Sequence, residues 1–263
     1  MKIMGIINVT PDSFYDGGRY YDRYRAVEHA VQLAEEGADI LDIGGESTRP
    51  GAAQVSEQEE MDRVCPVIEE VARRTALPVS VDTTKAAVAE AALKCGASMI
   101  NDISGCTFDA GMADVAARFG AGMVLMHIKG RPESMQNNPL YDGDFLSELY
   151  SFLSDSVERA LRAGVSAERI IIDPGIGFGK TLEHNYLIIN NIGYFKKMGY
   201  PVLIGLSRKS LIKNLYNNGS DCLPATIALN TVSYMNGADI IRVHDVREHR
   251  LALKSLDMLK KVS

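Results

Sequence analysis

The chain has 263 residues, which is too long for a small disulfide scaffold and about right for one large α/β domain. Its 46% hydrophobic and 24% charged residues are ordinary for a globular protein and exclude a disordered or collagen-like chain. The net charge of -6 gives no general attraction to nucleic acid or to anionic lipid, so an anionic ligand would need a local cluster of cations.

Short apolar runs alternate with amphipathic segments along the whole chain, and no linker divides it, which predicts a single domain over residues 1–263. Eight runs are expected to be buried strands: Ile3–Val9, Asp39–Gly44, Val79–Thr83, Met99–Ile103, Met123–Ile128, Ile170–Asp173, Val202–Leu206 and Asp239–Val243. Eight strand and helix repeats of roughly 33 residues each predict an eight-stranded parallel TIM barrel of the α/β class. An open, doubly wound sheet is the alternative.

The ends of the helical segments carry their own signals. A glycine stands just before most of the later strands, and we expect each to form a left-handed cap: Gly37, Gly96, Gly120, Gly164, Gly199 and Gly237. Pro66 interrupts the second helical pattern and is expected either to kink that helix or to shift its start.

Polar or charged side chains recur where the predicted strands end: Asn8, Asp42, Glu46, Asp82, Asn101, Asp102, His127, Asp173, Ser207, Arg242 and His244. A TIM barrel carries its active site at this end, in the loops that follow the strands. We therefore expect these side chains to converge on one polar pocket. The alternative for any single one is that it merely caps the next helix.

Three loops are rich in glycine. The stretch Asp173–Thr181 follows a strand, but its spacing fits neither a dinucleotide fingerprint nor a Walker loop. Its glycines are instead expected to let the backbone approach a flat ligand to which Phe178 presents its ring. The loops at 8–18 and 44–51 contain Phe14 and Arg49, which predicts mobile lids over the site.

Cations follow the last two predicted strands, in the segments Gly205–Ser210 and Arg242–Asp245. Loops at this position in barrels often bind phosphate, so we expect a phosphate or pyrophosphate site here. The alternative for Arg208 and Lys180 is simple solvation at the surface.

Other kinds of site are not expected. The sequence has no Gly-x-Ser-x-Gly elbow, and His29 and His249 fall in helical patterns that predict surface positions. A magnesium ion held by Asn8 and by ligand phosphates would need no protein cage. Four scattered cysteines predict reduced thiols, and the absence of a long apolar run predicts a cytoplasmic protein without a membrane or nucleic-acid partner.

Taken together, the motifs resemble the dihydropteroate synthase family over nearly the whole chain. The resemblance is carried by the segments Asn8–Gly18, Asp42–Gly51, Val81–Thr83, Ile100–Gly105, Asp173–Thr181, Ser207–Ser210 and Arg242–Val246. It implies the TIM barrel already predicted and a folate-pathway enzyme. Such an enzyme joins para-aminobenzoate to a dihydropterin hydroxymethyl pyrophosphate and releases pyrophosphate. It also implies a homodimer and Mg²⁺ as cofactor.

The resemblance further implies roles for individual residues. Hydrogen bonds to the pterin are expected from Asp82, Asn101, Asp173 and Lys209, between walls formed by Ile103 and Met126. Pyrophosphate would be bound by Arg49, Arg242 and His244, with Asn8 on the metal. Para-aminobenzoate would contact Phe14, Thr48, Pro50, Phe178, Ser207 and Lys209. The residues expected to be catalytic are Asp82, Lys209, Arg242 and His244.

Two alternatives share the pterin contacts. A pterin-binding methyltransferase domain would not need Arg49, Arg242 and His244 around a pyrophosphate, and it usually works beside a cobalamin domain. A catalytically idle pterin-binding paralogue should have lost lid residues, yet Asn8, Phe14, Thr48 and Arg49 are present.

Overall fold

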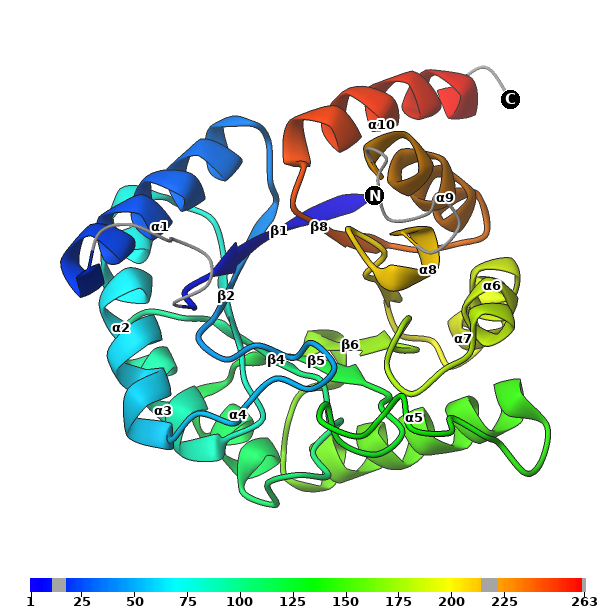
Figure 1. Ribbon diagram of the computed structural model, residues 1–263, viewed down its shortest axis with the longest axis horizontal. Coiled ribbons are helices and arrows are strands. Elements are labelled where there is room, and N and C mark those ends of the chain that lie inside the picture. Colours follow the sequence, from blue (N-terminus) through cyan, green and yellow to red (C-terminus); the bar gives the residue numbers. More distant parts are fainter. Residues whose placement is uncertain (11–17, 214–221, 262–263) are drawn as a thin grey trace.

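The structure is a computed structural model and describes residues 1–10, 18–213 and 222–261. Eight parallel strands form one sheet in the order β6-β5-β4-β3-β2-β1-β8-β7, and helices surround it (Figure 1). β6 meets β7 through a bridge between Ile172 and Val202, which brings the two ends of the sheet together. The prediction of a TIM barrel is therefore confirmed, and the open sheet is wrong.

The strands begin and end close to their predicted limits: β1 (Lys2–Asn8), β2 (Ile40–Gly44), β3 (Val79–Asp82), β4 (Met99–Asp102), β5 (Gly122–Met126), β6 (Ile170–Asp173), β7 (Leu203–Ile204) and β8 (Ile240–Val243). The largest difference is β7, which has two residues instead of five. Part of the cause is that the amide of Val202 donates to the Asp239 carboxylate at 2.7 Å instead of to a neighbouring strand.

The described residues form ten α-helices: α1 (Gly18–Glu35), α2 (Glu57–Arg74), α3 (Ala86–Lys94), α4 (Met112–Phe119), α5 (Phe145–Arg162), α6 (Leu182–Asn190), α7 (Ile192–Lys196), α8 (Ser210–Lys213), α9 (Leu223–Met235) and α10 (Val246–Lys261). Pro66 lies inside α2 and does not delay its start. Ser56 caps that helix by accepting from the Glu59 amide, and the acidic first turn favours the same start.

The predicted glycine caps are confirmed. All six glycines have positive φ, between 59° for Gly120 and 111° for Gly96. Gly37 illustrates the geometry: after it turns, the Ala38 amide donates to the Leu33 carbonyl at 2.9 Å, which closes the end of α1. The helices that end at these glycines can therefore stop sharply within a few residues of the next strand or, after Gly164, of the 3-10 helix Ala167–Arg169 that precedes β6.

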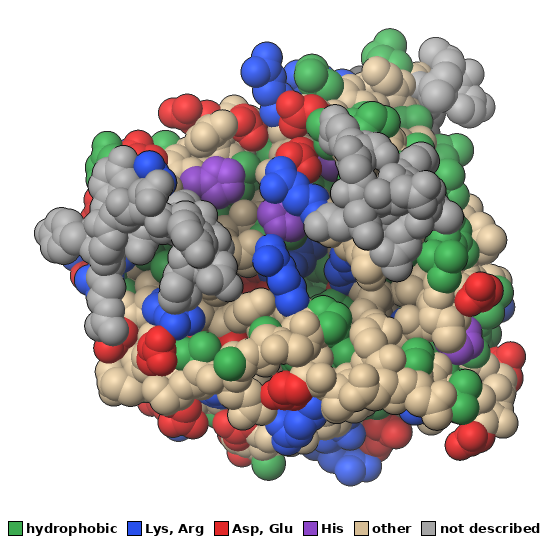
Figure 2. Space-filling model, in the orientation of Figure 1, with side chains coloured by type: hydrophobic (Ala, Val, Ile, Leu, Met, Phe, Trp, Pro, Cys, Tyr) green, Lys and Arg blue, Asp and Glu red, His purple; other side chains and the backbone are tan. Residues whose placement is uncertain are grey.

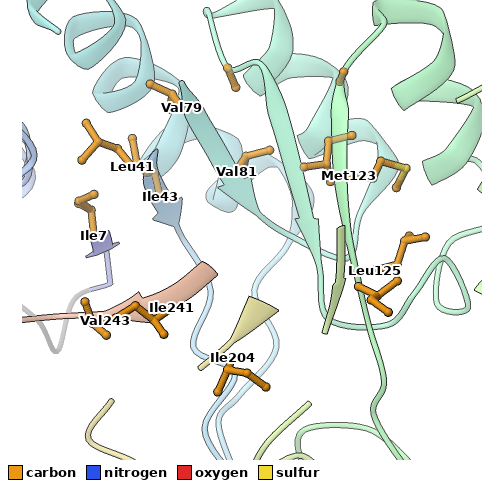
Figure 3. Close-up of a cluster of buried hydrophobic side chains, with 14 of the residues drawn as sticks. Ile7, Leu41, Ile43, Val79, Val81, Met123, Leu125, Ile204, Ile241 and Val243 are labelled. Atoms are coloured by element: carbon orange, nitrogen blue, oxygen red, sulfur yellow. The ribbon is translucent and has the colours of Figure 1, made fainter. Parts of the chain in front are cut away.

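Two clusters of the core lie on opposite sides of the barrel wall. Apolar side chains on the outside of the strands, including Ile7, Leu41, Val81 and Leu125, pack in the main core cluster, which also contains residues of the surrounding helices (Figure 3). A smaller cluster is formed by strand residues of the opposite orientation: Met4, Ile40, Val124, Leu203 and Ile240. The strand residues of the two clusters alternate, as expected when a barrel is filled by side chains instead of enclosing a pore.

Candidate active site

Arg242, at the end of β8, joins two carboxylates of other strands at the mouth of the barrel. Its Nε donates to Oδ2 of Asp42 at 2.6 Å, and its Nη2 donates to Oδ2 of Asp82 at 2.6 Å. The Arg242 side chain is 20% exposed, so the three charges lie close together in a largely dry setting. Side chains that are 40 to 200 positions apart in sequence therefore meet, as the strand-end pattern predicted.

Asp42, which the strand-end pattern predicted to lie in the pocket without assigning it a role, organises this part of the site. It is fully buried, and its Oδ2 also accepts a hydrogen bond from Nδ2 of Asn101 at 3.0 Å. Its Oδ1 has no partner among the described residues. Its place at a strand end, two residues before the glycines of the 44–51 loop, predicted that it lies in the pocket but not which residues it bonds to.

The electrostatic environment of Asp82 is unusual. Burial raises the pKa of Asp82 to about 7, and although Arg242 acts against this rise, the nearby Asp42 adds to it. The same two carboxylates raise the pKa of Arg242, which stays fully charged. The pair thus combines a permanent cation with a carboxylate that changes its charge near neutral pH.

Asp173 and Lys209 form the opposite side of the site. Asp173 ends β6, is buried, and accepts from the amide of Gly175 at 2.7 Å. Lys209 donates to the carbonyl of Ile176, and its Nζ lies 4.4 Å from the centre of the Phe178 ring. Burial lowers the pKa of Lys209 to about 8, while Asp173 opposes that change. Burial also raises the pKa of Asp173, with Lys209 as the main opposing charge.

A continuous apolar wall borders these polar groups. Ile103 and Met126, the two residues predicted to line a pterin slot, pack in one buried cluster with Ile128 and Met135, and the Phe178 ring packs against it. Arg131 adds a guanidinium over the Phe108 ring at 4.4 Å. The described mouth therefore offers a flat ligand an apolar face beside hydrogen-bonding groups.

The loops after β7 and β8 are tied to each other. Oγ of Ser207 lies 2.9 Å from Nδ1 of His244, and Arg208 pairs with Asp245 at 2.6 Å. Burial, with the neighbouring charges of Arg208 and Arg242, lowers the pKa of His244 to about 3. His244 is thus a neutral imidazole at physiological pH and can offer a hydrogen bond, but no positive charge, to an anion.

Thr48, Arg49 and Pro50 lie on the loop between β2 and α2. Thr48 lines a pocket together with Asp82 and Ile103, and the charge of Arg49 acts on His244. Pro50 is exposed, so its predicted contact with para-aminobenzoate stays a prediction. Phe14 lies outside the described residues, so its predicted role stays a prediction.

The start and end of this loop are better anchored than its middle. Lys85 pairs with Glu46 at 2.9 Å and with the buried Glu60 at 2.6 Å, and Glu46 also accepts from the amide of Val55.

Figure 2 shows Lys, Arg and His side chains gathered around the centre of the face seen along the barrel. The described mouth is thus locally cationic although the chain is acidic overall.

The alternative given for Lys180 and the expectation of a surface position for His249 are both wrong. Lys180 is buried, with 3% exposure, instead of being solvated, and it bonds to Nδ1 of His127 at 2.9 Å. His249 is 2% exposed because its ring bonds to the Asn230 side chain at 2.9 Å between α9 and α10. Arg208, by contrast, is exposed, as its alternative predicted, although it forms an ion pair with Asp245.

No cluster of three or more His, Cys, Asp or Glu side chains suited to a metal occurs in the described part of the chain. Asn8 ends β1 beside Gly44 and supplies a single amide oxygen at the mouth. No helix within the ranges 18–213 and 222–261 is long and apolar enough to cross a membrane.

The geometry agrees with the comparisons to known proteins. The model of the pterin binding enzyme family matches residues 4–244 of this chain. The chain therefore belongs to the pterin binding enzymes, which is the class that the barrel and its polar mouth define.

Closer relatives narrow this class. The chain is 47% identical to the dihydropteroate synthase of Bacillus subtilis, covering 98% of this chain and 88% of that protein. It is 44% identical to the enzyme of Escherichia coli K12, covering 97% and 90%. Within the pterin binding enzymes it is thus a member of the dihydropteroate synthases, transferases of folate biosynthesis.

Solved structures agree. The Clostridium difficile dihydropteroate synthase with pteroic acid has a TM-score of 0.92 at 41% identity, covering 98% of this chain and 96% of that chain. The Xanthomonas albilineans enzyme with 4-aminobenzoic acid has a TM-score of 0.91 at 42%, covering 98% and 93%. The Yersinia pestis enzyme with a sulfonamide drug complex has a TM-score of 0.91 at 42%, covering 99% and 94%.

Proposed function

We propose that the mouth of this barrel binds a dihydropterin hydroxymethyl pyrophosphate next to para-aminobenzoate and joins them, with the residue roles given below. The observation that carries these roles is the meeting of Arg242 with Asp42 and Asp82, opposite Asp173 and Lys209. This arrangement places permanent positive charge and hydrogen-bonding carboxylates around one apolar wall.

The pterin ring is proposed to lie against Ile103 and Met126. Its edge carries several hydrogen-bond donors and acceptors, and four residues can meet them with hydrogen bonds: Asp82, Asn101, Asp173 and Lys209. Asp173 is the central group because it is a buried carboxylate that retains accepting capacity beyond the bond from the Gly175 amide. A charge-assisted bond in such a setting is strong.

The pyrophosphate is proposed to be bound by Arg49, Arg242 and His244. Arg242 uses Nε and Nη2 for its two carboxylates, so other N–H groups of its guanidinium are available to phosphate oxygens. His244 would contribute a neutral hydrogen bond. These groups have most effect late in the reaction, when negative charge accumulates on the leaving group.

Magnesium is proposed as the cofactor. A single amide oxygen at the end of β1, without an acidic cage in the described residues, fits an ion that keeps several waters and takes its other ligands from phosphates. Asn8 would hold such an ion, which would neutralise part of the pyrophosphate charge when bound.

In the proposed reaction the arylamine nitrogen attacks the pterin methylene carbon. The new C–N bond forms as the C–O bond to pyrophosphate breaks, and the bonding pair leaves with the pyrophosphate while the amine releases a proton. An arylamine is already nucleophilic, so a strong general base is not needed. Asp82 would stabilise the positive charge that develops at the methylene carbon.

Para-aminobenzoate is proposed to lie between Phe178, the Lys209 stem and the loop that carries Thr48 and Pro50, with Phe14 completing the pocket. Its carboxylate would reach Ser207. A sulfonamide presents a similar ring, amine and anionic end, so we propose that it competes at this site.

We also propose a homodimer in the cytoplasm. Apolar side chains exposed on the last two helices, namely Val232, Met235, Leu251 and Met258, support a partner surface there. The four cysteines are free in the structure, as is usual in a reducing compartment.

The assay is pyrophosphate release from the dihydropterin substrate with magnesium, measured with and without para-aminobenzoate. We expect release that depends on para-aminobenzoate and yields dihydropteroate. Release without the arylamine, or none at all, would contradict the proposed reaction. The Asp82→Asn variant should retain binding of a pterin ligand while losing most turnover. This variant tests separately whether the Asp82 charge stabilises the methylene carbon during the reaction.

A further inference from the structure

Lys180 is a buried lysine that the proposed reaction does not use. It follows the glycine-rich loop after β6, is 3% exposed, and forms no ion pair with a carboxylate of the described residues. Burial lowers its pKa well below the usual value, with Lys209 acting in the same direction and Asp173 opposing it. Burying a lysine without an ion pair is costly, so its contacts need an explanation.

All three contacts of Lys180 hold parts of the active-site framework. Its Nζ lies 2.9 Å from Nδ1 of His127, 3.0 Å from the carbonyl oxygen of Phe178 and 3.4 Å from the carbonyl oxygen of His127 itself. In its charged form the Lys180 amine has three donors, which match these three acceptors. Burial, with Lys180 beside it, lowers the pKa of His127 to about 2, so the ring is neutral and Nδ1 can accept.

His127 is itself rigidly held, so it can serve as a fixed anchor. Its amide donates to the carbonyl of Asp173 at 3.0 Å, and its ring meets the edge of Phe152 at 4.7 Å between centres. The glycine-rich loop packs tightly against it, since a Cβ at Gly175 would lie 1.9 Å from the His127 carbonyl oxygen. Lys180 thus connects a rigid residue after β5 to the carbonyl of Phe178.

A second lysine holds the same loop at another carbonyl. Lys209 donates to the carbonyl of Ile176 and lies against the Phe178 ring. Lys180 takes the Phe178 carbonyl, two peptide units further on. Two lysines therefore hold the short segment that carries Phe178, and only Lys209 has a part in the proposed reaction.

We propose that Lys180 is a positioning residue for the arylamine pocket, acting by holding the Phe178 backbone to His127 so that the Phe178 ring faces para-aminobenzoate. This inference rests on the proposed place of Phe178 beside that substrate. The charge of Lys180 acts on Asp173, but the position of Asp173 depends less on Lys180, because its backbone pairs in β6 and its carboxylate accepts from the Gly175 amide. The loss of Lys180 should therefore affect the arylamine more than the pterin.

The test is steady-state pyrophosphate release by Lys180→Met, with para-aminobenzoate varied at saturating dihydropterin pyrophosphate and magnesium. We expect the KM for para-aminobenzoate to rise about tenfold while kcat changes less than about threefold, because a misplaced ring weakens binding of one substrate. The Kd of a pterin ligand should stay within about twofold of the original protein. Lys94→Met, at an exposed helix position, is the matched control.

A double-mutant cycle with Phe178→Ala shows whether Lys180 acts through that ring. In the Phe178→Ala background, Lys180→Met should add little further to the KM for para-aminobenzoate, since the group it positions is gone. Independent, multiplicative effects would overturn the inference. So would an unchanged KM, or equal losses for both substrates, which would indicate a purely structural lysine.

A second variant covers the case in which Lys180→Met does not fold. His127→Phe removes the Nδ1 acceptor and leaves Lys180 in place, so it should also raise the KM for para-aminobenzoate selectively. An unchanged KM in a folded His127→Phe protein would overturn the inference. Absence of turnover in the unmodified protein would instead contradict the proposed reaction, so the two failures can be distinguished.

Discussion

The cationic side chains at the barrel mouth are bound by two different kinds of partner. Arg242 is held by two carboxylates, Asp42 and Asp82, each at 2.6 Å. Lys180 and Lys209 are held mainly by backbone carbonyls, those of Phe178 and Ile176. The first arrangement compensates the cation by direct ion pairs, whereas in the second the direct bonds come mainly from carbonyl dipoles and Asp173 acts only as a nearby charge.

The difference appears in how readily each group loses its proton. The carboxylates raise the pKa of Arg242, while burial lowers the pKa of Lys209 to about 8 and that of Lys180 well below its usual value. On the ion-paired side, Arg242 therefore keeps its positive charge for a leaving anion. The carbonyl-bound side sets geometry, and its charge depends on pH and on Asp173.

The largest expected effect is at Asp173, the carboxylate that faces the lysine side. Asp173→Ala should weaken binding of a pterin ligand by about 2 to 5 kcal/mol, because ring donors would be left unpaired in a dry slot. Calorimetry measures this directly. Asp155→Ala, at an exposed position of α5, is the control, and an unchanged affinity in Asp173→Ala would refute the assignment.

On the ion-paired side, Arg242→Ala should lower kcat about a hundredfold, since leaving-group charge grows toward the transition state. Binding of a pterin that lacks phosphates should fall much less. Turnover and calorimetry on the same preparation separate the two quantities. Equal losses would point to a folding defect, for which Arg118→Ala on the surface provides the comparison.

Arg49 represents a third situation, an exposed cation on a loop. Ordering such a loop costs roughly 1 to 2 kcal/mol per residue, which is more than a single aromatic acid can supply. Pyrophosphate with magnesium can supply it, so para-aminobenzoate should bind more tightly once both and a pterin are present, by about 1 to 3 kcal/mol. Equilibrium dialysis showing equal affinity with and without pyrophosphate would mean that the pocket is preformed. Sulfonamides should follow the same dependence.

The smallest expected effects are on the pH profile. The pKa of Asp82 is raised to about 7, so its negative charge is lost as pH falls through 7. The pKa of Lys209 is lowered to about 8, so its positive charge is lost as pH rises through 8. We expect kcat/KM to fall up to about tenfold per pH unit on either side. Asp82→Asn should abolish the acid limb.

Lys209→Arg should shift the alkaline limb upward, because arginine stays charged. Ionisation of the substrates themselves would be the same in every variant, so a limb that moves with the residue belongs to the protein. A profile unchanged by both substitutions would show that neither group titrates in the working range.

Strand positions and helix ends could be predicted because their causes are local. Apolar runs predicted both ends of every strand to within about two residues. The strand most shortened is β7, where the Asp239 side chain accepts from the Val202 amide. The glycines before the strands predicted caps, since a left-handed residue is needed wherever a helix turns sharply into a strand.

The sequence predicted which residues lie in the site, but not which of them form hydrogen bonds or ion pairs with one another. Strand-end polarity placed Asp82, Asn101 and Arg242 at one mouth, yet nothing in the sequence indicates that Asp42 joins the last two across 59 and 200 positions. The burial of Lys180 was missed for the same reason, because its anchor His127 lies 53 residues away. Long-range pairing depends on packing that periodicity does not encode.

The bridge between Ile172 and Val202 has a consequence for how the barrel opens. Beside this bridge, the amide of Ile172 donates to the Pro201 carbonyl at 2.9 Å, whereas β1 and β2 pair over five positions. In native-state hydrogen exchange, the amides that join β6 to β7 should therefore exchange earlier than those that join β1 to β2. Asp173 ends β6 on one side of this bridge and Lys209 follows β7 on the other side. A ligand that bonds to both residues would therefore link the two strands. Such a ligand should slow exchange there more than elsewhere in the barrel.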